Sequence, residues 1–544
     1  MASSTADFIV HNAQIYTVDD RCPTATALAV REDRLVAVGD ADELLDAFPS
    51  ASRINARGRT LVPGLIDAHA HLQELGLSLR RADLTDTSSP TAVVERLRTF
   101  VANHDLPTHA WLRGHGWDET DWPSSESPAR EQLDAAFPDR PVWLTRTDVH
   151  AGWANTAALE ATVGLDRLRT MANPDGGRIE RTPDGTPTGV LVDAAMQLVE
   201  DQIPPPTEAQ RDRSLSAALR HTARHGITGL HDAGVDLVTI RRFRRRIEDD
   251  RFPLRVYAMI NGRGDAFDHF CEQGPLHHPS GRLSVESVKF FADGALGSRG
   301  AALLDEYADD PGNRGLLLHE DEAFRRDVQA AVECGFQVNT HAIGDRANRL
   351  VLDIYESAMQ ECSQSVRRPR IEHAQIVAPE DRSRFGELGV MASIQPAFAP
   401  SDMGWAPTRL GSNRLDRAYA WRSLQEAGAS LAFGSDAPVE PIDPIRGFHA
   451  AVTRQDENGD PAGGWRPGER VNRSTALHAY TQGAAYAAFQ EDEVGSITPG
   501  KRADFVVLSQ NLMTVAPSRL LDTEVVATYI DGTPVYAGDE WPTG

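Results

Sequence analysis

Two histidines separated by a single residue end an apolar stretch near the start of the chain. The stretch Val62-Pro-Gly-Leu-Ile-Asp-Ala-His-Ala-His71 has the composition of a β-strand, in which alternate side chains point to the same face. His69 and His71 should therefore lie side by side at the end of that strand. Two adjacent imidazoles suit a divalent metal ion. A chance His-x-His sequence in a loop is the alternative, and this motif alone does not exclude it.

Four further polar residues fall near the carboxyl ends of later predicted strands: Lys289, His341, His373 and Asp436. Taken singly, either histidine could be a core residue with its hydrogen bonds satisfied, and Asp436 could be a helix N-cap. Their recurrence at the same end of several strands favours a shared metal site. Asp436 supports this interpretation, because a carboxylate that follows a mostly apolar strand is costly to bury unless something compensates its charge.

Lys289 needs a separate explanation, because a positive charge inside a metal site repels the cation. The chain contains only two lysines, Lys289 and Lys501, among 55 basic residues. Arginine would be the expected residue if positive charge were the only requirement. An amine, unlike a guanidinium, can lose its proton and add to CO2, which gives an anionic carbamate able to bridge two metals. A snorkelling surface lysine and a substrate-binding ammonium remain the alternatives.

Eight short apolar segments alternate with helical patterns through the middle of the chain. This alternation predicts an α/β fold, a TIM (β/α)8 barrel. Asp345 is expected to cap the helix that follows His341. That helix has its apolar face at Ala347, Leu350, Val351, Ile354 and Ala358. The predicted strands are 61–69, 227–232, 254–260, 285–291, 336–341, 370–373, 390–395 and 431–436.

Both ends of the chain contain short strand patterns broken by Asp, Asn and Gly, which are typical of β-structure with tight turns. We expect residues 1–62 and 490–544 to pair into one small β-sandwich domain, with the barrel spanning 63–489. The interval 85–215 is too long for a simple crossover and predicts an inserted subdomain after the first barrel strand. Its tryptophans are interpreted as subdomain core in preference to pocket wall: Trp111, Trp117, Trp122, Trp143 and Trp153.

The composition excludes several classes of protein. The net charge of −24 disfavours nucleic acid and anionic membrane as partners. Acidic excess with almost no lysine suggests, as a hypothesis, adaptation to a salty cytoplasm. The four scattered cysteines lack a Cys-x-x-Cys pair, so a disulfide framework or cysteine–zinc site is not expected. No stretch approaches the roughly 18–20 apolar residues of a membrane span, and we expect a cytoplasmic enzyme.

Several longer motifs accompany these residues. They are Val288-Lys-Phe-Phe-Ala-Asp-Gly-Ala-Leu-Gly-Ser-Arg299, His341-Ala-Ile-Gly-Asp-Arg-Ala-Asn348, Arg370-Ile-Glu-His-Ala-Gln375, Gly495-Ser-Ile-Thr-Pro-Gly-Lys-Arg-Ala-Asp-Phe-Val-Val-Leu508 and Thr147-Asp-Val-His-Ala-Gly-Trp-Ala-Asn155. With the HxH stretch they make nearly the whole chain resemble the metal-dependent amidohydrolase superfamily, and within it amidohydrolase family 3, the YtcJ-like group.

The resemblance implies a ligand set. One metal would be bound by His69, His71 and Asp436, and a second by His341 and His373. Carboxylated Lys289 would bridge the two. One or two ions are compatible with the pattern, and zinc is favoured, although Mn, Fe or Co also suit these donors.

The resemblance also implies a reaction, the hydrolysis of a non-peptide C–N bond in a small molecule. A metal lowers the pKa of bound water to ~7 and so supplies hydroxide at neutral pH. Asp436 would accept the water's proton and deliver it to the leaving nitrogen. His150, His231, Asp293 and Arg299 are weaker candidates for substrate contact, with a surface role for His150 and a ligand-supporting role for His231 as alternatives.

Two other functions stay open at this point. The same machinery could act on an ester or lactone, or isomerise its substrate, because fold and ligands do not separate these reactions. A non-catalytic scaffold relative is a third possibility, although such a protein should have lost ligands and this chain retains all of them. The sequence also leaves the identity of the substrate and the formation of a homo-oligomer open.

Overall fold

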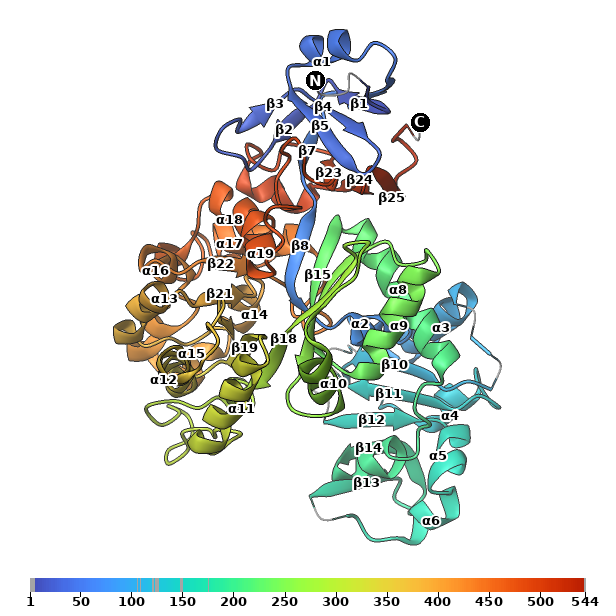
Figure 1. Cartoon of the computed structure of the whole chain (residues 1–544). Coiled ribbons are helices and arrows are strands. Elements are labelled where there is room, and N and C mark those ends of the chain that lie inside the picture. The colour runs from blue at the N-terminus through green and yellow to red at the C-terminus, as the bar shows by residue number, and fades with distance from the viewer. Residues whose placement is uncertain are drawn as a thin grey trace. The chain divides into compact units, whose positions relative to one another are not determined.

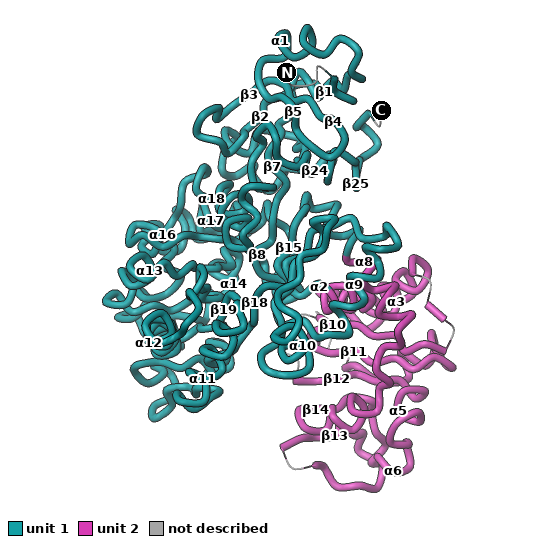
Figure 2. The backbone as a smooth tube through the Cα atoms, viewed as in Figure 1, with its two compact units in different colours: residues 1–72, 219–544 teal, residues 73–218 magenta. Residues whose placement is uncertain are grey.

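The computed structural model of this protein describes residues 5–104, 106–107, 109–119, 122, 127–146, 150–174 and 176–542. It contains two compact units, one made of residues 1–72 and 219–544 and the other of residues 73–218 (Figure 2). The unit boundaries fall within α2 (Leu72–Ser78) and α8 (Glu208–Arg224).

The first unit contains the predicted barrel. Eight strands lie in the order β22-β21-β20-β19-β18-β16-β15-β8, and each neighbouring pair is parallel (Figure 1). All eight predicted strands are therefore confirmed, with shifts at their ends. They are β8 (Leu65–Ala70), β15 (Ile227–Val235), β16 (Arg255–Asn261), β18 (Leu283–Phe291), β19 (Gln337–Ala342), β20 (Arg370–His373), β21 (Met391–Ile394) and β22 (Leu431–Phe433).

The first predicted strand, 61–69, is two strands in the structure. β7 (Thr60–Pro63) belongs to the β-sandwich, and β8 begins the barrel after Gly64. A Cβ at Gly64 would lie 2.2 Å from the Thr228 hydroxyl oxygen, so only glycine allows the chain to pass this close to β15. Because the segment from residue 61 to residue 66 is almost entirely apolar, its sequence does not show that the chain passes from the β-sandwich to the barrel.

The barrel is closed by backbone hydrogen bonds between β8 and the segment that follows β22. The amide of Asp436 donates to the His69 carbonyl (2.7 Å), and the amide of His71 donates to the Ala437 carbonyl (2.8 Å). Gly434 permits this approach, since a Cβ there would lie 2.5 Å from the His69 nitrogen. This closing seam brings the first and last predicted ligands together, although 365 residues separate His71 from Asp436 in sequence.

Helices flank the barrel strands, and α12 (Asp345–Glu361) shows how one of them is formed. Its buried face includes Ala347, Val351, Ile354 and Ala358, as the spacing predicts. Asp345 is not the N-cap; Gly344 is, and the Asp345 carboxylate instead accepts a hydrogen bond from the Leu304 amide. The other helices after β15 are α9 (Leu237–Glu248), α10 (Asp265–Gln273), α11 (Asp321–Glu333), α13 (Arg382–Leu388), α14 (Phe398–Asp402), α15 (Ala406–Leu410), α16 (Trp421–Glu426), α17 (Pro444–Thr453), α18 (Arg473–Ala479) and α19 (Gln482–Ala487).

A β-sandwich is built from both ends of the chain. Its two sheets have the orders β5-β4-β1-β6 and β25-β24-β23-β7-β2-β3, and they share one core that includes Val10, Leu28, Phe505 and Tyr529. α1 (Ala41–Ala47) follows β5. The strands are β1 (Phe8–His11), β2 (Gln14–Tyr16), β3 (Thr24–Ala25), β4 (Ala27–Arg31), β5 (Arg34–Gly39), β6 (Ser52–Asn55), β23 (Phe505–Leu508), β24 (Val525–Ile530) and β25 (Thr533–Ala537).

The second unit contains the insert. It has a six-stranded mixed sheet in the order β13-β14-β12-β11-β10-β9. Trp117, Trp122 and Trp153 lie in one of its hydrophobic cores and Trp143 in another, which confirms the interpretation of the tryptophans as core. Trp111 packs against the second core from a partly buried position. Its strands and principal helices are β9 (Ala82–Asp83), β10 (Leu112–Trp117), β11 (Val142–Arg146), β12 (Ala151–Ala154), β13 (Gly177–Arg181), β14 (Pro187–Asp193), α3 (Pro90–Asn103), α4 (Arg130–Asp134), α5 (Thr156–Thr162), α6 (Leu165–Thr170) and α7 (Gln197–Glu200).

One disulfide corrects the sequence analysis. Cys271 on α10 and Cys334, directly after α11, are bonded with their Cα atoms 5.2 Å apart. The sequence separation of 63 concealed the pairing, because the two positions come together only when α10 and α11 pack as successive helices of the barrel. Cys22 and Cys362 are free.

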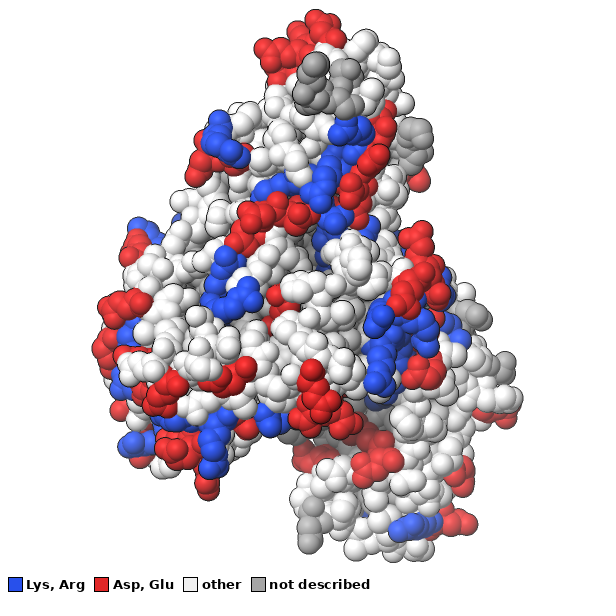
Figure 3. All heavy atoms as spheres, viewed as in Figure 1, with Lys and Arg blue, Asp and Glu red and all other residues white. Residues whose placement is uncertain are grey.

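Charged side chains of both signs are interspersed over the face shown in Figure 3. Among the described residues, no helix combines the length and the apolar character that a membrane-spanning segment needs.

Candidate metal centre

All six predicted metal ligands line one pocket of the first unit. The pocket has a volume of about 510 Å³, which is in the range for small-molecule sites. Because parallel strands present their carboxyl ends at one edge of a sheet, β8, β18, β19 and β20 deliver their polar side chains to the same place. The six are His69, His71, Lys289, His341, His373 and Asp436.

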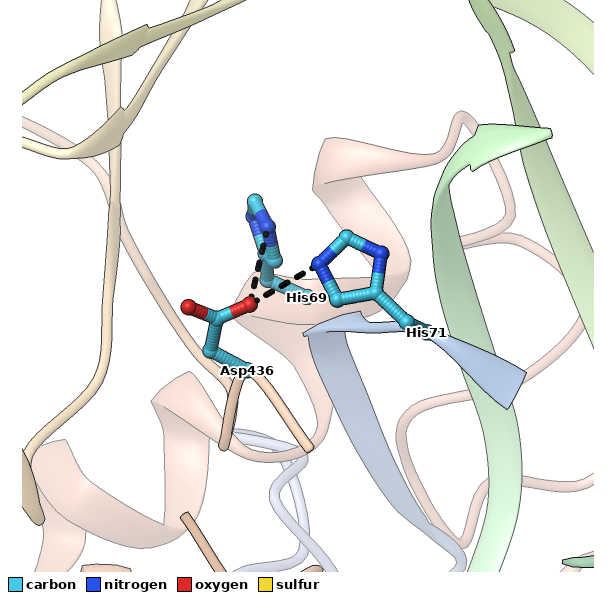
Figure 4. Close-up of side chains that lie close together, drawn as sticks. All are labelled: His69, His71 and Asp436. Atoms are coloured by element: carbon cyan, nitrogen blue, oxygen red, sulfur yellow. Dashed lines mark hydrogen bonds and ion pairs between the residues drawn. The ribbon is translucent and has the colours of Figure 1, made fainter. Parts of the chain in front are cut away.

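Three of these residues form the tightest group (Figure 4). Asp436 Oδ1 lies 3.0 Å from His71 Nε2 and 3.5 Å from His69 Nε2. One ligand atom from each residue lies within 4.8 Å of the others. Asp436 presents one carboxylate oxygen to both imidazoles, while its other oxygen points away from them (Figure 4).

The Nδ1 atoms of three histidines are held by partners outside this group. His69 Nδ1 lies 2.6 Å from Glu372 Oε2, His71 Nδ1 lies 2.8 Å from the Ala233 carbonyl, and His373 Nδ1 lies 2.7 Å from Gln395 Oε1. A carbonyl oxygen only accepts, so Nδ1 of His71 is the protonated nitrogen. Such partners orient an imidazole and direct the lone pair of its Nε2 toward a metal.

The donor set fits a cation. With Nδ1 of His71 donating to Ala233, its neutral ring would place the Nε2 lone pair 3.0 Å from a carboxylate oxygen. Two lone pairs at that distance repel each other unless a proton or a cation lies between them. His69 Nε2 is buried and has no hydrogen-bond partner, a costly condition for a polar atom. A divalent metal would satisfy all three residues at once.

His341 and His373 lie beside this group. The His373 ring centroid is 4.9 Å from that of His69 and 4.7 Å from that of His341. Lys289 is 1% exposed, and its Nζ lies 4.4 Å from the centroid of the Phe291 ring. Among the residues that the structure describes, no second trio of His, Cys, Asp and Glu donors is drawn together as closely as the first.

Burial governs the electrostatics of the pocket. Burial lowers the pKa of His69 and of His341 well below the ordinary value and lowers that of His373 to about 3. These rings are therefore neutral at pH 7, as metal ligands must be. Burial also opposes the charge of His71, but the hydrogen bond to Asp436 and the negative charges of Asp436 and Asp232 together outweigh it and raise the pKa of that ring. Burial lowers the pKa of Lys289 to about 8.

The backbone is strained at two of the candidate ligands. His373 has φ 75° and Asp436 has φ 60°, in the left-handed region that residues with a side chain seldom adopt. Ala374 follows His373 with φ 42°. Such conformations cluster at functional sites, where the surrounding structure imposes them.

Sequence reasoning did not identify the residues that hold His69. Glu372 and Arg370 are 0% exposed, and Arg370 Nε lies 2.9 Å from Glu372 Oε1. Arg370 also contacts the Ala68 carbonyl (2.7 Å), Ser393 Oγ (3.0 Å) and His231 Nδ1 (2.9 Å). Both residues belong to the motif Arg370–Gln375, which marks the resemblance to the family. That motif could have pointed to them, but only His373 was predicted to have a role in the site.

Residues 53–536 match the model of a family described as "Amidohydrolase family". The chain belongs to the amidohydrolase family. This confirms the resemblance noted from the motifs, and the chain is similar to three relatives over nearly its whole length. The amidohydrolase is 35% identical to Protein LONG AFTER FAR-RED 3 of Arabidopsis thaliana (98% of this chain, 92% of the relative). It is 32% identical to Putative amidohydrolase YtcJ of Bacillus subtilis (97% and 99%). It is 30% identical to N-substituted formamide deformylase of Arthrobacter pascens (97% and 98%).

A solved structure shares the fold. A metal-dependent hydrolase from Pyrococcus horikoshii is 27% identical, with a TM-score of 0.75 over 94% of this chain and 98% of the other. A second, from Pyrococcus furiosus, is 28% identical with the same TM-score, over 93% of this chain and 99% of the other. Family and fold together support a hydrolase of the metal-dependent type.

Of the weaker candidates, the three in the first unit, His231, Asp293 and Arg299, are not among the residues that line the pocket. His150 belongs to the second unit, where its exposed ring contacts Asp193 (2.8 Å). Three residues of the insert motif, 147–149, lie outside the described residues. His231 is buried and paired with Arg370, which agrees with the alternative of a supporting role.

Asp293 connects the loop after β18 to the segment after β19, and Arg299 lies within the loop after β18. Asp293 is 1% exposed, and its oxygens accept hydrogen bonds from the amides of Ala302, Ile343 and Gly344. Burial raises its pKa to about 7. Arg299 pairs with Asp309 (2.8 Å). These contacts all lie within the protein, and neither side chain is among the residues that line the pocket. Asp293 Oδ1 also lies 3.5 Å from Nε2 of His341, which does line it.

Proposed function

We propose that this amidohydrolase hydrolyses a non-peptide C–N bond, such as an amide, in a small molecule. The observation that carries the proposal is the convergence of six candidate ligands on one pocket at the carboxyl edge of the barrel. The relative named N-substituted formamide deformylase supports an N-formyl or N-acyl amine as the class to test first.

The donors suit two divalent ions, with zinc the preferred choice. His69, His71 and Asp436 would hold one ion, and His341 and His373 a second. Lys289 would lie between them as a carbamate, formed when its free amine adds to CO2 and releases a proton. When bound, such a metal supplies a Lewis acid that polarises a carbonyl and makes water more acidic.

The chain's own residues supply proton transfer and exclusion of water. Asp436 Oδ1 faces the imidazoles, which leaves Oδ2 to take a proton from the attacking water and return it to the leaving nitrogen. Phe291, Phe398 and Trp405 line the pocket and would shield the reacting carbonyl from bulk water.

A matched substrate panel tests the proposed reaction. We expect the metal-loaded enzyme to release amine from N-formyl and N-acyl amines faster than it releases alcohol from the corresponding esters and lactones. A chelator should abolish the activity, and added metal should restore it. Hydrolysis of the esters or lactones with no release of amine would replace the proposal with the alternative reaction.

Metal content tests the role of Lys289. We expect about two equivalents per chain by plasma mass spectrometry in the wild type and a sharp fall in Lys289→Arg, because arginine cannot form the carbamate. Lys501→Arg is the matched control, since Lys501 is the only other lysine and donates to carbonyls of the 491–494 segment.

Two other results would change the assignment. One equivalent that persists in Lys289→Arg would indicate a mononuclear hydrolase with Lys289 as a substrate-binding ammonium. No metal in either protein, even after reconstitution, would favour the non-catalytic alternative.

A further inference from the structure

Two carboxylates lie on the pocket wall apart from the candidate metal ligands. Asp402 ends α14, and Glu440 follows the loop after β22; both line the pocket that contains the ligands. We call this pair the acidic wall. It belongs to the catalytic pocket and has no part in the hydrolytic mechanism above.

Asp402 is held by neutral donors. Its Oδ2 accepts hydrogen bonds from the Tyr419 hydroxyl (2.5 Å) and from Gln375 Nε2 (3.1 Å). Gln375 also donates to the Tyr419 hydroxyl (2.8 Å). Burial, together with the neighbouring charge of Glu440, raises the pKa of Asp402 to about 7. The carboxylate is therefore fixed in position, and among the described residues the groups that shift its pKa are two neutral donors and a second carboxylate.

Glu440 has a similar environment. Burial raises its pKa, while a hydrogen bond from Ser401 and the charge of Arg446 oppose that rise. The Arg446 guanidinium pairs with Glu457 (2.6 Å), so its charge is shared with another carboxylate. Two partly buried carboxylates thus line one cavity with little compensation, and a ligand that supplies positive charge would favour their ionised form over protonation.

Aromatic rings complete this side of the cavity. Phe398 opens α14, and its ring stacks against the His373 ring at 6.1 Å with an interplanar angle of 11°. Trp405 lies three residues after Asp402 and lines the same pocket. A cation is attracted to the face of an aromatic ring, most strongly that of tryptophan, and aromatic faces beside carboxylates recognise alkylammonium groups.

We infer that the acidic wall and its aromatic neighbours bind a cationic group, such as an alkylammonium, carried by the substrate beyond the bond that is cleaved. This inference rests on the proposed function for the identity of the reaction. It defines the substrate class as N-formyl or N-acyl amines with a second, positively charged nitrogen. It excludes N-acyl amino acids, whose carboxylate would face the acidic wall.

Binding of an isosteric pair tests the inference without hydrolysis. Choline and 3,3-dimethylbutan-1-ol have the same shape and differ in charge. We expect calorimetry on the metal-loaded wild type to give about tenfold tighter binding of choline. The advantage should largely disappear in Asp402→Asn and in Glu440→Gln, whose amide oxygens can still accept hydrogen bonds. Glu387→Gln, at an exposed position on α13, is the matched control and should keep the advantage.

Equal affinity of the two probes in the wild type would overturn the inference. So would a choline advantage that survives in both variants, because the cation would then bind elsewhere. A second readout is the kcat/KM ratio for N-formyl-4-(aminomethyl)benzylamine and its 4-hydroxymethyl analogue, which should favour the cation about tenfold in the wild type. If neither compound is hydrolysed but the choline advantage depends on Asp402, the proposed reaction fails and the cation site stands. If both are hydrolysed equally and choline has no advantage, the reaction stands and the cation site fails.

Discussion

Replacing Asp436 with asparagine should lower kcat by about 10²–10⁴-fold, equivalent to about 3–5 kcal/mol of barrier. The amide keeps an oxygen in the place of Oδ1, which lies 3.0 Å from His71 Nε2, so metal binding should be retained. It cannot accept the proton that the proposed mechanism assigns to Oδ2. The measurement is steady-state kinetics on metal-loaded protein, with metal content determined on the same preparation.

Two results would contradict this assignment. Near-wild-type kcat would show that Asp436 does not transfer the proton. Loss of activity together with loss of metal would assign Asp436 to metal binding and leave the proton shuttle unidentified. Thermal unfolding serves as the control for the fold, because the backbone amide of residue 436 closes the barrel through its hydrogen bond to the His69 carbonyl. Since the substitution leaves the backbone intact, we expect the unfolding midpoint to change little.

The positions of the candidate ligands were predictable because strand ends are predictable. In a parallel barrel all carboxyl ends meet at one rim, so polar residues at the ends of separate strands converge whatever their distance in sequence. Lys289 on β18, His341 on β19 and His373 on β20 follow this rule. The strand pattern therefore predicted which of these polar side chains line the pocket without any knowledge of helix packing.

The residues that hold the ligands were not predictable in the same way. Strand alternation places Glu372 and His373 on opposite faces, yet Glu372 contacts His69 while His373 lines the pocket. The left-handed backbone at His373, φ 75°, breaks the alternation. Local sequence contains no clear signal for that conformation, because residues other than glycine seldom adopt the left-handed region.

The side-chain contacts of the closing seam, between β8 and the segment after β22, could not be predicted from the sequence either. Asp67 is buried, and its carboxylate accepts hydrogen bonds from the His69 amide (3.1 Å), the Ser435 amide (3.0 Å) and the Ser435 hydroxyl (2.6 Å). Burial raises its pKa to about 6. Asp67 and Ser435 lie in the two sequence stretches that contain His69, His71 and Asp436, but they are 368 positions apart in the chain. A single sequence contains no signal that two residues so far apart are in contact.

Replacing Glu372 with glutamine should have the second large effect, on stability and on metal affinity together. Glu372 and Arg370 are 0% exposed and 2.9 Å apart. Removing one partner of a buried ion pair leaves the other charge uncompensated, at a cost of about 3–5 kcal/mol. Loss of the carboxylate that orients a ligand histidine typically lowers metal affinity about 10–100-fold. Denaturant unfolding and metal titration with a competing chelator would measure the two effects.

A second substitution separates orientation of His69 from compensation of Arg370. In the double variant Glu372→Gln and Arg370→Met the buried positive charge is absent, so much of the stability should return, whereas the metal affinity should stay low because His69 Nδ1 still lacks its carboxylate. Glu426→Gln, which removes an exposed partner of Arg422 on α16, should change the free energy of unfolding by less than about 0.5 kcal/mol. If metal affinity recovers with stability in the double variant, Glu372 acts through the fold alone. If it does not recover, the carboxylate positions His69 for the metal, and the 370–375 stretch contributes a positioning residue as well as a ligand.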